Sequence, residues 1–278
     1  LFSGNKQYSD ESLLKFFEGL IGKDVTFRDL SNASLKIQSF YRDKGFITTR
    51  AIIPKQDFLN GIIKIAIIES YLEDIVITGG TEGTRDYIKY MTDKILMENK
   101  ENKIFNFSDL ERQLLLIKRS DIGKLTSTLS KGSNIGSSIL TINIEPNPLN
   151  ISAFSNTDIS SNLGDYTVGL KSSYTTKSRK PIKIGTSAKY AFPIPDGLTS
   201  GVLVVEKPIA RKGLSLNSIV AYSTTKTKDL FPLTAGESIN KGTSEYFSLG
   251  MSYPFVLKRN TEIGFDLSTT IQNSHQDL

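Results

Sequence analysis

Hydrophobic positions in the first half of the chain follow the period of an amphipathic helix in four places. The two longer stretches, residues 30–43 and 108–119, place most of their apolar side chains on one face. A shorter stretch of the same kind precedes each of them, at residues 10–19 and 85–97. We therefore expect two pairs of helices in this part of the chain.

The two longer helical stretches open with nearly the same four residues, which indicates an internal repeat. Phe27-Arg28-Asp29-Leu30 recurs as Phe107-Ser108-Asp109-Leu110. Each copy continues with a glycine, a strand, a glycine-bearing turn and a second strand, the strands being residues 46–53, 62–69, 124–129 and 138–145. An opening strand lies at residues 72–78 in the second copy and is truncated to residues 2–3 in the first. Both copies therefore have the order β-α-α-β-β, which predicts two tandem α+β domains, residues 1–70 and 71–146.

The last part of the chain changes from helical spacing to alternation. Five stretches alternate apolar residues with small polar ones, and a sixth, residues 201–207, is weaker; the five are residues 166–175, 182–192, 214–223, 247–255 and 263–271. A water-soluble sandwich alternates in the same way, so the pattern alone leaves that alternative open. Small residues on the polar side and aromatic residues near strand ends favour strands that cross a membrane.

We therefore expect an all-β region over residues 147–278, the N-terminal part of an antiparallel transmembrane β-barrel. Closed barrels of this kind have at least about eight strands. Because the alternating region offers fewer, we expect it to be part of a larger barrel.

The amino-acid composition argues against several kinds of catalytic site. The chain has no cysteine and one histidine, His275, so thiol chemistry is excluded and a Ser-His-Asp triad is disfavoured. The net charge of +5 comes without a dense basic block, which argues against nucleic-acid binding. Residues 132–136 are glycine-rich, but no helical pattern follows them, which argues against a nucleotide-binding loop. We expect a protein that is not an enzyme and binds no metal, cofactor, nucleotide or nucleic acid.

A specific set of residues at fixed spacing stands in the first repeat: Tyr41, Gly45, Pro54, Gln56, Asn60 and Gly61. This set resembles the POTRA repeat of two-partner secretion transporters of the TpsB type, the ShlB/FhaC/HecB haemolysin secretion/activation family. The second repeat and residues 147–278 resemble the same family more loosely. The chain departs from the family at Ser70, where glycine is usual after the glutamate, and at Ile122, where proline is common.

The resemblance implies a protein of the Gram-negative outer membrane whose POTRA domains lie in the periplasm. Such a transporter recognises an unfolded secreted partner, haemolysin-like or adhesin-like, and exports it through a β-barrel pore surrounded by outer-membrane lipid. An outer-membrane assembly factor that inserts other barrels also carries POTRA repeats and is the alternative. A soluble adhesin or carbohydrate-binding protein is a more distant one. The Pro-x-Gln and Asn-Gly signature, with two repeats, favours transport.

The first repeat is expected to expose an edge strand to which an extended partner can add. Its residues are Ile47, Thr48, Thr49, Arg50, Ala51, Ile52 and Ile53. We expect their backbone to bind the partner, and their apolar side chains to line a groove with the helix of residues 30–41. Core packing of the isoleucines and solvation of Arg50 are the alternatives. We expect Pro54, Asn60 and Gly61 to bound the hairpin, and Gly45 to end the helix.

Overall fold

The computed structural model describes residues 1–57, 61–100, 104–147, 149–160, 162–194, 197–228 and 239–277. The chain divides into two compact units. The first comprises Leu1–Thr78, Met91–Leu114 and Leu125–Asn143, and the second comprises Gly79–Tyr90, Leu115–Lys124 and Ile144–Leu278. The predicted domain boundaries after residues 70 and 146 stay a prediction.

The first α+β domain has the predicted order of elements: β1 (Phe2–Ser3), α1 (Asp10–Leu14), the 3-10 turn η1 (Glu18–Leu20), α2 (Phe27–Asp43), β2 (Arg50–Ile52) and β3 (Ile65–Ile68). The central strand of its three-stranded sheet is β3. β1 runs parallel to β3 on one side, and β2 runs antiparallel to it on the other. The expected truncated opening strand is therefore the two-residue β1.

The first helix is shorter than its pattern predicted. α1 ends at Leu14, and the N–H groups of Phe16 and Phe17 then bond to the carbonyls three residues back. The resulting turn sends Phe16 against Phe40 and Phe17 against Phe2, with ring centroids 5.5 and 5.8 Å apart. Two consecutive phenylalanines thus reach separate parts of the core, which a regular helix would not allow so readily.

The sequence specifies α2 at both ends. Thr26 and Asp29 form a capping box, in which the Asp29 N–H donates to Thr26 Oγ1 at 3.3 Å and the Thr26 N–H donates to the Asp29 carboxylate at 2.9 Å. The hydroxyl and N–H of Thr26 hold the pKa of Asp29 below its usual value. Beyond the C-terminus, Gly45 has a φ of +92°, a conformation that glycine adopts without strain. Between its ends the helix contributes to one core, made of Leu13, Phe17, Leu30, Ala33, Ile37, Tyr41, Phe46, Ala51, Ile65 and Ile67.

The second α+β domain repeats the same order: β4 (Tyr71–Gly79), α3 (Glu82–Lys100), α4 (Phe107–Arg119), β5 (Gly123–Lys131) and β6 (Ser137–Pro146). Its sheet has the order β4-β6-β5, so the last strand is again central. This match in topology confirms the internal repeat. Among the described residues, no helix is long and apolar enough to span a membrane.

Glu73 on β4 anchors the glycine-rich turn between β5 and β6. Its carboxylate accepts hydrogen bonds from the Ser133 N–H at 2.9 Å and from the hydroxyls of Ser133 and Ser137, both at 2.5 Å. These donors, led by the Ser133 hydroxyl, hold the pKa of Glu73 below its usual value. The turn therefore closes a hairpin and is tied to the neighbouring strand.

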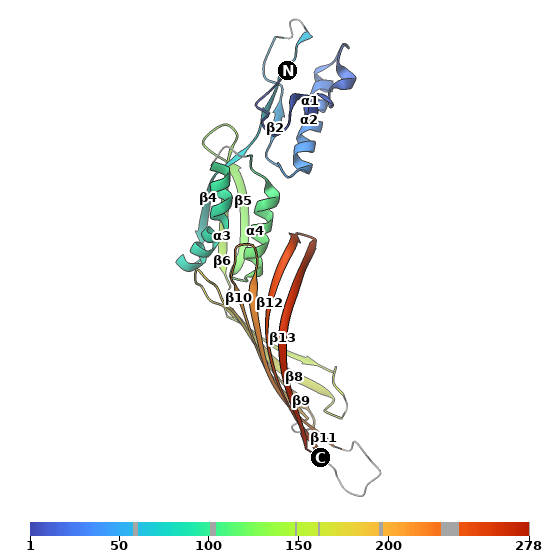
Figure 1. Cartoon of the computed structure of the whole chain (residues 1–278), viewed down its shortest axis with the longest axis vertical. Coiled ribbons are helices and arrows are strands. Elements are labelled where there is room, and N and C mark those ends of the chain that lie inside the picture. Colours follow the sequence, from blue (N-terminus) through green and yellow to red (C-terminus); the bar gives the residue numbers. More distant parts are fainter. Residues whose placement is uncertain are drawn as a thin grey trace. The chain divides into compact units, whose positions relative to one another are not determined.

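The rest of the chain forms one antiparallel sheet of long strands, whose elements β10 to β13 are labelled in Figure 1. Its strands are β7 (Asn150–Asn156), β8 (Tyr166–Thr175), β9 (Lys183–Phe192), β10 (Leu198–Pro208), β11 (Ser215–Lys228), β12 (Ile239–Lys258) and β13 (Thr261–Asp277). They pair in chain order, and β7 and β13 are the two edges, so the described residues form an open sheet.

β7 is the strand that the alternation did not predict. Its phenylalanine, Phe154, pairs with Gly169 and lies on the polar face of the sheet, where the alternating rule expects a small or polar residue. The ammonium group of Lys171 on β8 lies over the Phe154 ring, 4.7 Å from its centroid. A cation–π contact therefore accommodates the aromatic ring on this face. Because Phe154 stands where a polar residue is expected, the alternation of apolar and polar residues does not reveal this strand.

The two faces of the long sheet differ in the way that a membrane barrel requires. One face carries a row of paired apolar residues, one on each strand from β10 to β13. They are Leu203 (39% exposed), Val220 (45%), Phe247 (42%) and Ile271 (68%). On the other face, Ser215, Ser248 and Ser252 are each only 5% exposed. A water-soluble sandwich buries its apolar face, whereas this sheet turns its apolar face outward. The sheet thus has the character predicted for the start of a barrel wall.

Within the second compact unit, Asp121 joins the end of α4 to the long sheet. It has a φ of +56°, which is uncommon for a residue other than glycine. Its carboxylate accepts a hydrogen bond from the Asn147 side chain at 2.9 Å and pairs with Lys183 at 3.1 Å. Arg119 on α4 pairs with Glu262 on β13 at 2.6 Å. Partly exposed ion pairs therefore hold the strands against this helix end.

Replacing Ile37 by alanine tests the core of the first domain. Ile37 is fully buried on α2, so Ile37→Ala should lower the free energy of unfolding of this domain by about 2–5 kcal/mol. The matched control is Leu35→Ala on the same helix, because Leu35 is 55% exposed and its loss should change that free energy by about 0.5 kcal/mol or less. Hydrogen exchange of residues 27–43 in the detergent-solubilised chain measures both. Equal effects of the two variants would contradict this core.

Candidate partner-binding edge

Among the described residues, β2 is an edge strand of its sheet. It pairs with β3 through Arg50↔Ile68, Ala51↔Ile67 and Ile52↔Ala66, and it is the last strand in the order β1-β3-β2. An edge strand presents N–H and C=O groups that no other strand of the sheet binds. Such groups can pair with the backbone of an added extended segment.

This edge strand is shorter than the sequence predicted, because Ile47, Thr48 and Thr49 form a turn. The N–H of Phe46 bonds to the carbonyl of Tyr41 at 2.9 Å, and the N–H of Thr49 bonds to the carbonyl of Phe46 at 3.2 Å. Phe46 is only 8% exposed and packs near the Tyr41 ring. Drawing this ring into the core bends the chain, and pairing with β3 begins only afterwards, at Arg50.

The side chains of the predicted binding segment point in different directions. Ala51 is 4% exposed and belongs to the core, and Ile53 packs against that core. Since side chains alternate along a strand, Arg50 and Ile52 lie on the opposite face of the sheet, where Ile52 is 44% exposed. The expectation that Ile52 lines a groove with the helix is therefore wrong. Ile47 is 38% exposed on the turn.

Pro54 and Gln56 follow the edge strand, and Gln56 continues its ladder with a side chain. The Gln56 amide donates to the Lys64 carbonyl at 2.9 Å and accepts from the Lys64 N–H at 2.8 Å. Proline lacks an N–H, so backbone pairing is interrupted at Pro54, and the Gln56 amide takes the place of the next backbone pair. Of the expected turn residues, Gly61 has a φ of +65°, and Asn60 lies outside the described residues.

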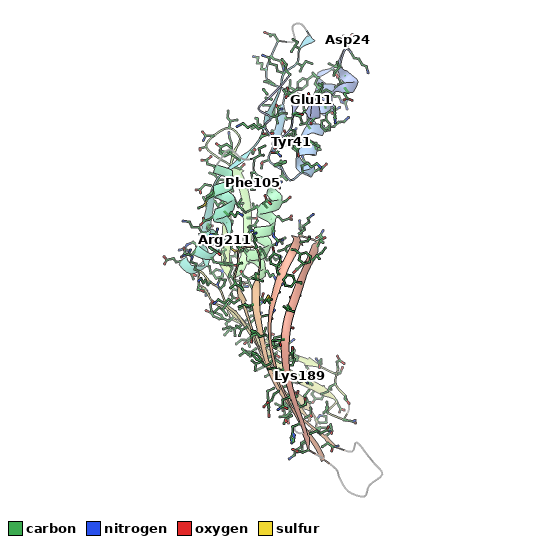
Figure 2. All side chains as sticks on the ribbon, in the orientation of Figure 1. Glu11, Asp24, Tyr41, Phe105, Lys189 and Arg211 are labelled. Carbon is green, nitrogen blue, oxygen red and sulfur yellow. The ribbon has the colours of Figure 1, made fainter. Side chains whose placement is uncertain are left out.

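Tyr41 ties the helix behind this edge to the end of β3. Its ring is fully buried, and its hydroxyl donates to the Glu69 carboxylate at 2.7 Å. The same carboxylate accepts from the N–H groups of Lys6 and Gln7 at 2.8 and 2.9 Å. Burial, followed by the bond to Glu69, raises the pKa of Tyr41 well above its usual value. Tyr41, labelled in Figure 2, thus fixes three segments of the first domain at one point.

The second domain has an edge strand, β5, that is equivalent to β2 and that was not predicted as a binding site. β5 is the last strand in the order β4-β6-β5 and holds the place that β2 holds in the first domain. It has nine residues against three in β2. The internal repeat could have predicted this edge. The strand of the second repeat that corresponds to β2 is expected to lie at the same place in its sheet.

The described residues contain no group of three or more His, Cys, Asp or Glu side chains that could hold a metal ion. This region also contains an edge strand, whose backbone groups can pair with an extended polypeptide.

Known proteins share both the sequence and the fold. Residues 1–70 match the family model described as POTRA domain, ShlB-type. Over 142 residues the chain is 25% identical to the heme/hemopexin transporter protein HuxB of Haemophilus influenzae (strain 86-028NP), covering 50% of this chain and 24% of HuxB. Over 127 residues it is 28% identical to the outer membrane transporter CdiB of Dickeya dadantii (strain 3937), covering 46% and 21%. The alignments therefore span about a quarter of the length of these curated relatives.

Solved structures extend the likeness in fold to the long sheet. CdiB from Escherichia coli superposes with a TM-score of 0.70 at 16% identity, over 100% of this chain and 50% of that one. CdiB from Acinetobacter baumannii gives 0.58 at 15% identity, over 99% and 53%. Together the matches confirm the resemblance to two-partner secretion transporters, and with it the POTRA fold followed by a sheet like the start of a barrel. The homologues are outer-membrane transporters with periplasmic POTRA domains, and this chain has the same location.

The Tyr41 hydroxyl makes the stability of the first domain sensitive to alkaline pH. A phenol whose pKa is raised by folding keeps its proton when the unfolded chain, with a tyrosine pKa of about 10, loses it. Its contribution is therefore complete below pH ~10 and declines as the pH rises above that value. Tyr41→Phe should lower the free energy of unfolding by about 1–3 kcal/mol at pH ~7, because Glu69 loses a buried donor, and should flatten the decline above pH ~10.

Unfolding followed by hydrogen exchange of the first domain between neutral and alkaline pH measures this effect. Tyr222→Phe is the control, because Tyr222 is 51% exposed on the long sheet. An alkaline decline that is as steep in Tyr41→Phe as in the unaltered chain would assign the pH dependence to another group.

Proposed function

We propose that this chain belongs to an outer-membrane transporter that receives an unfolded secreted protein through its periplasmic POTRA domains. The observation that carries the proposal is the free edge of β2 in a domain that matches the ShlB-type POTRA model. The transporter would pass the secreted protein through a β-barrel whose wall begins with β7 to β13. The relatives named above are transporters rather than enzymes, which supports a role in transport.

At the first edge, the secreted protein would add as a strand beside Arg50, Ala51 and Ile52. Main-chain hydrogen bonds would supply affinity with little sequence preference, which suits a long client that presents many different segments. Arg50 and Ile52 would contact the side chains on one face of the added strand. The other residues of the predicted segment lie outside β2, so they would border this site rather than pair with the client. They are Ile47, Thr48, Thr49 and Ile53.

The second edge, β5, would offer the client a further place to add. Leu125 and Leu129 alternate there with exposed Lys124, Thr126 and Thr128. An alternating client strand would meet apolar groups on one side and hydroxyl groups on the other. Two edges in series would allow the client to be handed from one domain to the next.

The long sheet would form the conducting part. Its outward apolar face would contact outer-membrane lipid, and its serine-rich face would line a hydrated interior. A client passing such a wall would meet hydroxyl groups and backbone rather than adhesive apolar side chains. The alternative function, insertion of other barrels into the membrane, would use the same edges. The transporter relatives favour export over that alternative.

Cysteine cross-linking tests whether the client adds as a strand. These 278 residues contain no cysteine, so Arg50→Cys introduces their only thiol, on the edge strand. The client to test would be a large secreted protein whose gene neighbours that of the transporter, carrying single cysteines at successive positions. We expect disulfide yields to alternate between high and low with every residue of the client, because successive side chains of a paired strand point to opposite faces.

Lys36→Cys on the exposed side of α2 is the matched control and should give no alternating pattern. Secretion of the client by the cysteine variants, measured under reducing conditions, shows that the transporter still works. Uniform cross-linking along the client, or none at Arg50→Cys in a secreting strain, would remove strand addition at β2 from the mechanism.

A further inference from the structure

The turn that leads into β2 is held by residues of the second domain. The Phe107 N–H donates to the Gly45 carbonyl at 2.9 Å, and the Asn106 side-chain amide donates to the Lys44 carbonyl at 3.3 Å. On the other side of the turn, the Ser70 hydroxyl donates to the Thr48 carbonyl at 3.0 Å. These residues all belong to the first compact unit.

Ser70 and residues 105–108 are linked to each other as well. The Phe105 N–H donates to the Ser70 carbonyl at 2.9 Å, and Phe105, labelled in Figure 2, is only 1% exposed. Asn106 Oδ1 accepts from the Ser108 N–H at 2.9 Å, which makes Asn106 the N-cap of α4. The start of this helix and the domain junction therefore form one hydrogen-bonded support under the turn.

The turn itself is not strongly stabilised from within. Gly45 has a φ of +92°, and a β-carbon there would overlap the side chain of Asn106 and crowd the Ser108 hydroxyl. The hydroxyls of Thr48 and Thr49 are buried and have no hydrogen-bond partner among the described residues, which is unfavourable. The hydrogen bonds from Asn106, Phe107 and Ser70 therefore help to stabilise the conformation of this turn.

The edge strand depends on the turn because β2 is so short. It pairs with β3 at three positions, and its first residue, Arg50, follows Thr49 directly. A strand of this length contributes few ladder hydrogen bonds of its own, so its place is set largely by the segments that enter and leave it.

We propose that Asn106, Phe107 and Ser70 are positioning residues for the partner-binding edge of the first domain. The inference rests on the proposed function in taking β2 as the place where the client adds. The second domain would then do more than continue the chain toward the membrane. It would hold the first docking edge in its paired, accessible conformation, so that capture of the client depends on an intact junction.

The substitution Asn106→Asp separates this support from the helix cap. Aspartate still accepts from the Ser108 N–H and caps α4, but it has no N–H to donate to the Lys44 carbonyl. Ser70→Ala is a second variant, which removes the bond to Thr48 from the opposite side. Asn143→Asp is the control: it places the same change in the second domain, where Asn143 Oδ1 accepts a hydrogen bond from Thr78.

Hydrogen exchange in the detergent-solubilised full chain is the first measurement. Asn106→Asp and Ser70→Ala should each speed exchange of residues 46–52 by roughly threefold to tenfold, as expected for the loss of one hydrogen bond. Exchange of the α2 core should stay unchanged, which shows that the domain is folded, and Asn143→Asp should leave residues 46–52 unaffected. Unchanged exchange of residues 46–52 in both variants would overturn the proposal.

Capture of a model strand is the second measurement. The probe is a peptide of about ten residues that alternates valine and threonine and carries one central cysteine, tested by disulfide formation with Arg50→Cys. Asn106→Asp and Ser70→Ala should lower the yield, and Asn143→Asp should not. Faster exchange with unchanged yield would show that the support does not position the edge for binding, and would overturn the inference. No capture by Arg50→Cys alone would instead count against strand addition at β2, and exchange would then decide the positioning role by itself.

Discussion

The carboxylate of Glu69 is the point on which the first domain depends. It accepts one hydrogen bond from the buried Tyr41 hydroxyl and two from the backbone N–H groups of Lys6 and Gln7. A charged acceptor with several donors is worth more than a neutral pair, and losing a donor leaves charge poorly compensated. The helix α2, the end of β3 and the segment after β1 all meet there, so this one group joins three segments of the domain.

The residue next to Glu69 begins the connection between the two domains. Ser70 accepts from the Phe105 N–H through its carbonyl and donates to the Thr48 carbonyl through its hydroxyl. Where the resembling family usually has glycine, this chain has a side chain that bonds to the turn before β2. The departure noted in the sequence therefore has a structural use, because a glycine at this position has no group to make that bond.

The repeat, the order of elements and the sheet character followed from the sequence, because periodicity and glycine spacing are local signals. The length of β2 did not, since it depends on Phe46 being drawn into a core that includes residues distant in the chain. β7 escaped prediction because Phe154 breaks the alternation and is accommodated by Lys171 on the neighbouring strand. The pairing of Gln56 with Lys64 could not be predicted either. A sequence motif identifies Gln56, but it does not show which backbone groups its side chain binds.

Exposed edge strands can lead to aggregation, and many proteins protect them. In the described part of the chain, β2 and β5 are equivalent edge strands of the two three-stranded sheets. These edges are limited in different ways: β2 by its length and the following Pro54, and β5 by exposed Lys124 and Lys131 near its ends. A net gain of about 0.5–1.5 kcal/mol per backbone hydrogen bond means that a three-residue edge holds a strand only weakly. Differences in affinity mostly change the dissociation rate, so a weakly bound client is released quickly. Quick release is an advantage for a transporter that passes its client onward. If the proposed function holds, the short first edge and the longer second one would favour progress of the client over its retention at the first contact.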